Sequence, residues 1–140
     1  MMILAKILVQ IASLLSPVAL AQMAPEIRQQ ILSSGVPSEA LDRILTTLAS
    51  VRGPFLARTT PDKAVEVSVR NHTKAVIIDF SRPSTEKRFF YIDLVSGQVE
   101  SHYVAHGRNT GLNWAVMFSN IPDSKTSSLG LYITGPQYTG

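Results

Sequence analysis

Apolar positions in the first third of the chain follow a helical period. From Pro25 to Ala49 they recur every three or four residues, and Gly35-Val36-Pro37 divides the run. This pattern predicts two short helices that form a hairpin over residues 22–50, with Ser38 capping the second helix. The apolar stripe that we expect to face a core consists of Ile27, Ile31, Leu32, Leu41, Ile44, Leu45 and Leu48.

Residues 51–63 interrupt this periodicity. They contain Gly53-Pro54 and Thr59-Thr60-Pro61-Asp62, which predicts a linker without helix or ladder pairing. After the linker, Val65, Val67 and Val69 alternate with polar residues, as in a strand with one wet face. Ala75 to Ile78 is continuously apolar and predicts a strand covered on both faces.

The remaining segments also favour extended structure. Residues 89–95 and 98–105 flank Ser96-Gly97, which predicts an antiparallel hairpin. Residues 106–127 are rich in Gly, Asn, Ser, Pro and Asp and predict a long loop, and Leu129, Leu131 and Ile133 suggest one more strand. The predicted fold is mainly β with a short N-terminal helical hairpin, and residues 64–140 form the β domain.

The first 21 residues have the layout of a secretory signal peptide. Lys6 precedes an apolar run, Pro17 breaks it, and Ala19-Leu20-Ala21 supplies small residues at a cleavage spacing. The alternative, a membrane anchor, needs roughly 20 continuous apolar residues, and this run is shorter. We therefore expect cleavage after Ala21, export, and no stable membrane span afterwards.

Charge and composition narrow the classes of function. The 140 residues are 45% hydrophobic and 16% charged, as in one globular domain. Without residues 1–21 the chain has 12 basic and 10 acidic side chains, a net charge of +2. The cations are scattered singly, which argues against nucleic-acid binding. The chain has no cysteine, so these residues contain neither a thiol nucleophile nor a thiolate zinc site, and we expect no metal or cofactor.

Several blocks in one order resemble the catalytic domain of murein L,D-transpeptidases, from Ile77 to Gly135. They are Ile78–Arg88, Tyr91–Leu94 with Gly97, Val104–Gly107, Phe118–Asn120 and Ser127–Gly130. The resemblance implies a β-sandwich in the periplasm or cell envelope, where a cysteine thiolate attacks a peptidoglycan stem peptide and a histidine carries the proton.

The family carries these groups in a His-Gly segment and a Ser-x-Gly-Cys segment, which by the order of the blocks we expect beyond Gly140. We therefore expect a truncated, incomplete sandwich that is inactive alone, with no catalytic residue of its own. The candidates near such a site are His106, Gly107, Ser128 and Gly130. His106-Gly107 resembles the catalytic His-Gly pair of the family. By the order of the blocks, however, it corresponds to the end of an earlier, structural strand of the family's domain, so we do not assign the role of the base to His106. The alternative is a non-catalytic envelope protein that uses the same sheet as a structural module or to bind peptidoglycan or another protein.

An incomplete sandwich has a structural consequence. Apolar side chains that a later sheet would cover should stay exposed, and the residues concerned are Val76, Ile78, Leu129, Leu131 and Ile133.

Other motifs favour structural interpretations. Ser84-x-x-Lys87 has the spacing of a serine nucleophile and its lysine, but the partner motifs are absent and Pro83 favours a turn. His102 and His106 would lie roughly 13 Å apart on a strand, too far to share one metal ion. Trp114, Met117 and Phe118 favour core or loop-anchoring positions over a sugar-binding platform.

Overall fold

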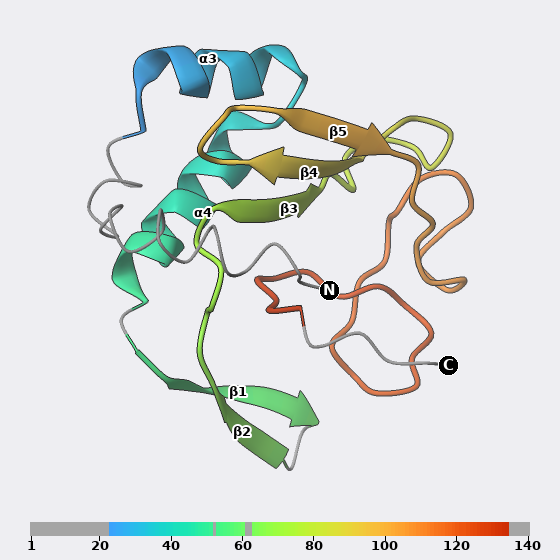
Figure 1. The fold of residues 1–140 in the computed structure, drawn as a ribbon. Helices are drawn as coiled ribbons and strands as arrows, with labels where there is room; N and C mark the ends of the chain where they lie inside the picture. The colour runs from blue at the N-terminus through green and yellow to red at the C-terminus, as the bar shows by residue number, and fades with distance from the viewer. Residues whose placement is uncertain (1–22, 52, 61–62, 135–140) are drawn as a thin grey trace.

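The computed structural model describes residues 23–51, 53–60 and 63–134, without the side chains of residues 58–60. Within these residues it contains two helices, a two-stranded sheet and a three-stranded sheet, both antiparallel (Figure 1). Helix α4 lies against one face of the three-stranded sheet, and the β1–β2 hairpin extends to one side. The prediction of a mainly β fold with an N-terminal helical hairpin is confirmed.

The helical hairpin consists of α3 (Pro25–Ser33) and α4 (Ser38–Ser50). Gly35 adopts φ +87° in the turn between them, a conformation that glycine reaches without strain. Arg28 Nη1 reaches Asp42 Oδ1 at 2.7 Å and ties the two helices together. The predicted Ser38 cap is wrong: Pro37 occupies the capping position, Ser38 is the first helical residue, and no side chain caps the helix.

The larger sheet has the order β3 (Lys74–Ile78), β4 (Phe89–Asp93) and β5 (Val99–His102). The predicted hairpin around Ser96-Gly97 joins β4 to β5. Apolar side chains on the helix side of this sheet meet the stripe of the helical hairpin and form the core. The buried members are Ile31, Val36, Leu41, Leu45, Ile77, Phe90, Ile92 and Leu94.

The smaller sheet corrects the interpretation of residues 51–63 as unpaired. Residues Phe55–Thr60 form β1, which pairs antiparallel with β2 (Lys63–Val67). Gly53-Pro54 precedes β1 and is not part of a strand, as predicted, but Phe55 to Thr60 pairs with β2. The pairing of β1 with β2 therefore overrides the local turn propensity.

Two further strand predictions, for residues 75–78 and 129–133, need correction. β3 is covered by α4 on one face, but Val76 and Ile78 on the opposite face are 37% and 39% exposed, so the strand is not covered on both sides. Residues 128–134 contain no strand, and Leu129, Leu131 and Ile133 are 57%, 51% and 43% exposed. The expectation of incomplete cover at these five positions is confirmed.

The long loop, defined here as residues 106–127, has no regular strand or helix, as predicted. A parallel bridge between Phe118 and Ser127 closes its second half. The proposed signal peptide lies outside the described residues. Across the described part of the chain, no helix has the length and hydrophobicity needed to cross a bilayer.

Candidate functional site

The outer face of the three-stranded sheet is a mixed polar and apolar surface. The strand registers place alternate residues of β3, β4 and β5 in three rows, because side chains on a strand point alternately to the two faces. Val76 and Tyr91 lie in the middle row, and Tyr91 is 38% exposed. The side chains on this face are Lys74, Val76, Ile78, Phe89, Tyr91, Asp93, Glu100 and His102.

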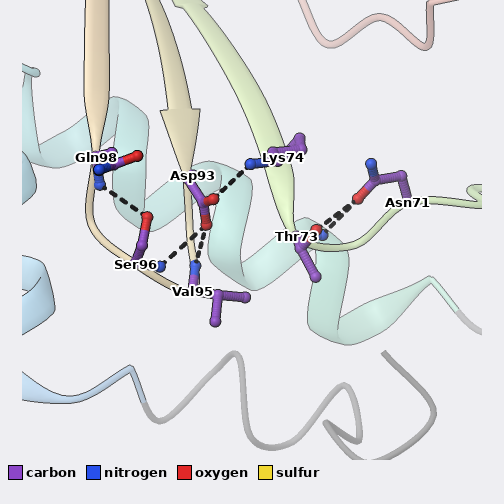
Figure 2. A network of polar contacts seen from close by, with 7 residues as sticks. All are labelled: Asn71, Thr73, Lys74, Asp93, Val95, Ser96 and Gln98. Carbon is purple, nitrogen blue, oxygen red and sulfur yellow. Dashed lines mark hydrogen bonds and ion pairs between the residues drawn. The ribbon is translucent and has the colours of Figure 1, made fainter. Parts of the chain in front are cut away.

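Asp93 organises one end of this face (Figure 2). Its Oδ1 accepts from the amides of Val95 and Ser96 at 2.9 and 3.0 Å, and its Oδ2 accepts from the Lys74 ammonium. Burial of this carboxyl would raise its pKa, but the hydrogen bonds from Lys74 and the two amides outweigh it, so the pKa lies below the ordinary value. The Asp93 carboxylate therefore holds the β4–β5 turn in place.

A shallow hollow lies beside this network. It has a volume of about 500 Å³. On one side it is lined by Gln30 of α3 and by Ser34, just after this helix, and on the other by Lys74, Asp93 and Glu100 of the sheet. The polar groups of Lys74 and Asp93 are already paired with each other. The hollow presents no nucleophile with a partnered base.

Arg88, immediately before β4, is the most completely enclosed charged residue that the structure describes, with 0% exposure. Its Nε and Nη2 donate to the Val104 carbonyl, and its Nη1 donates to the Arg82 carbonyl at 2.9 Å. The guanidinium also lies 5.1 Å from the centre of the Phe80 ring. Burial lowers its pKa and the Asp79 carboxylate acts in the opposite direction, but an arginine remains charged.

The geometry around His106 identifies its tautomer. Arg88 Nη2 lies 2.8 Å from His106 Nδ1, and a guanidinium can only donate, so Nδ1 must be the acceptor. The ring proton is then on Nε2, which donates to the Gly111 carbonyl at 3.2 Å. Both ring nitrogens are engaged in structural contacts. His106 is therefore not poised to take a proton from a nucleophile.

Gly107 lies where two segments of backbone approach closely. A Cβ at this position would lie 2.5 Å from the Lys125 carbonyl oxygen, so the long loop can close only over a glycine. The Gly107 amide donates to Ser127 Oγ at 2.9 Å, and the Ser127 amide donates to Thr110 Oγ1. Thr110 is fully buried and also accepts from the amides of Val116 and Met117.

The structure thus brings some candidate residues together and leaves others apart. Gly107 contacts Ser127, next to Ser128, whereas Gly130 lies beyond this contact and is exposed. Ser128 Oγ accepts from the Tyr132 hydroxyl. No contact joins His106 to Ser128 among the described interactions.

The other motifs lie apart from this cluster. Ser84 lies in a turn, where its amide donates to the Asn113 carbonyl at 2.7 Å, and Lys87 is exposed. His102 lies near Phe89 and Glu100 rather than His106. In the described residues, no group of three His, Cys, Asp or Glu side chains could hold a metal ion.

The aromatic part of the long loop is only partly as expected. Phe118 packs against Phe80 at a centroid distance of 5.7 Å, which anchors the loop. Trp114 and Met117 are 55% and 62% exposed, so of the two predicted roles, core or loop-anchoring, the core role is excluded for them. The pattern of the sequence does not reveal that Arg88 and Thr110 are buried. Their polarity gave no signal of burial, since only the tertiary contacts supply acceptors and donors for them.

A comparison with known protein families identifies the family of this chain. The L,D-transpeptidase catalytic domain matches residues 56–140, more than half of the chain. The chain therefore belongs to this family, whose members act on peptidoglycan peptides and are generally associated with the cell envelope. Neither a curated protein nor a solved structure matches the chain.

Proposed function

We propose that this chain provides the non-catalytic, N-terminal part of a peptidoglycan L,D-transpeptidase domain and does not itself transfer acyl groups. The observation that carries the proposal is the absence of cysteine from all 140 residues of a member of a cysteine acyltransferase family. Without a thiolate, no thioester with the stem peptide can form.

The surroundings of His102, His106 and Ser84 support this proposal. His106 has both ring nitrogens in hydrogen bonds, and His102 is an exposed residue on the sheet. Ser84 lies in a turn rather than at the start of a helix, so Lys87 is not one helical turn away from it. These arrangements supply no activated nucleophile in place of the thiol.

The test is an activity assay on the purified chain. We expect neither cross-linking nor trimming of muropeptides, and no covalent carbapenem adduct in the intact mass. Cross-linking that disappears in Ser84→Ala would replace the proposal with a serine mechanism. The coding sequence beyond codon 140 offers an independent check, because in-frame His-Gly and Ser-x-Gly-Cys segments would identify the rest of the catalytic domain.

A second candidate function is supported by the open face of the sheet. Val76, Ile78 and Tyr91 are each more than a third exposed, which leaves an apolar centre between charged side chains. Such a surface suits a non-catalytic module that binds peptidoglycan. Co-sedimentation with purified sacculi would support this function if Tyr91→Ala weakens it and Leu112→Ala, which removes an apolar side chain from the long loop, does not.

A further inference from the structure

The contact between Arg88 and His106 joins two segments that are 18 residues apart in the sequence. We call this pair the latch. Arg88 is fixed immediately before β4 by the carbonyls of Val104 and Arg82. His106 is the first residue of the long loop, and its Nε2 reaches forward to the Gly111 carbonyl. The latch therefore connects the rigid sheet to the interior of the loop.

The latch depends on a neutral imidazole. Protonation of Nδ1 would remove the acceptor and place two cations at a separation of 2.8 Å. Of the groups that line the ring, Phe80 is apolar and lies at a centroid distance of 6.5 Å, and Gly111 offers only a carbonyl. The Asp79 carboxylate, which acts on Arg88, already accepts from Arg82 and Ser81. Asp79 is therefore engaged elsewhere and does not bridge the two cations.

Two features of the long loop make its conformation depend on the contact between His106 and Gly111. The backbone of Gly111 lies against Trp114, since a Cβ on Gly111 would lie 2.0 Å from the Trp114 carbonyl oxygen. Five apolar side chains of the loop are more than half exposed and gain little from packing. They are Leu112, Trp114, Val116, Met117 and Ile121. Hydrogen bonds and the Phe118–Phe80 contact, rather than burial of these five side chains, hold this part of the loop.

We propose that the latch is an acid-sensitive switch, in which protonation of His106 releases the long loop from the sheet while the helical hairpin and the three strands stay folded. His106 acts as a positioning residue for the loop and its Gly107–Ser127 contact. This inference concerns the fold alone and does not rest on the proposed function.

Hydrogen exchange on the full chain, expressed from Met1 and purified, tests the switch. After correction for the intrinsic effect of pH, amides of the long loop should lose protection by roughly tenfold or more on acidification from pH 8, because a hydrogen bond to a charged group is lost. Amides of β4 should keep theirs. Trp114 is the only tryptophan in the chain, so its single indole resonance should shift over the same range.

A matched pair of variants separates the latch from general acid effects. In His106→Gln the amide oxygen can accept from Arg88 and the amide nitrogen can donate to Gly111 at every pH, so the loop transition should disappear. In His102→Gln, which changes an exposed histidine on β5, the transition should persist. Nitrogen-15 shifts of the imidazoles should show His106 as the Nε2–H tautomer at pH 8.

Three results would overturn the proposal. One is a wild-type loop whose protection does not change with pH, and another is a transition that survives in His106→Gln. The third is a simultaneous loss of protection in β4, which would mean that acid unfolds the whole domain. If His106→Gln does not fold, the tautomer of His106 measured at pH 8 in the wild type still tests the proposal. An Nδ1–H tautomer would overturn it, because that nitrogen could not accept from Arg88.

Discussion

Replacement of Asp93 by alanine should destabilise the domain through the β4–β5 turn. The substitution removes the acceptor of the Val95 and Ser96 amides and the partner of Lys74. Hydrogen bonds to a charged group contribute about 1.5–3 kcal/mol each, and bonds that share one acceptor are not additive, so we expect a loss of about 3 kcal/mol. Asp93→Asn keeps an oxygen for the amides and should cost only about 1 kcal/mol.

The pH dependence follows from the lowered pKa of Asp93. Because the folded-state pKa is below the unfolded-state value, the unfolded chain binds the proton more tightly, and stability rises with pH across this range. The contribution of Asp93 is therefore fully present above the unfolded pKa, about 3.9, and is lost as the pH falls through the folded value. The difference between the wild type and Asp93→Asn should shrink accordingly.

Urea unfolding followed by circular dichroism, at pH 7 and again near pH 3, measures both effects. Asp123→Asn is the control, since Asp123 is 90% exposed and pairs with Lys125 on the surface, and it should change stability by less than about 0.5 kcal/mol. Equal stability of wild type and Asp93→Ala at pH 7 would refute the reasoning. So would a difference between wild type and Asp93→Asn that is as large at pH 3 as at pH 7.

Three further predictions concern the loop, export and association. Gly107→Ala should destabilise the long loop by about 1–3 kcal/mol, because its Cβ would overlap the Lys125 carbonyl, and hydrogen exchange should locate the loss in residues 107–127. Exported protein should have an intact mass that begins at Gln22, whereas a mass that includes Met1 in a membrane fraction would indicate an anchor. The exposed apolar residues on the outer face of the three-stranded sheet should make residues 22–140 marginally stable. They should also cause concentration-dependent association, which sedimentation experiments measure. A protein that stays monomeric at high concentration and unfolds in a sharp thermal transition would contradict this.

The sequence by itself determined the elements whose signals are local. The stripe containing Ile31 and Leu41 identified both helices, since helical periodicity needs only neighbours three or four residues apart. Ser96-Gly97 marked the β4–β5 hairpin, where Gly97 has φ +76°. The family blocks identified the L,D-transpeptidase domain, which the match over residues 56–140 confirms.

The tertiary structure decided features that depend on contacts between distant residues. Phe55 to Thr60 forms a strand because β2 pairs with it, and residues 128–134 contain no strand despite their alternating apolar pattern. Arg88 is buried because carbonyls 6 and 16 residues away and the His106 ring surround its guanidinium. A local pattern states what a segment can form, but a ladder or a buried charge also requires a partner, and only the folded chain supplies it.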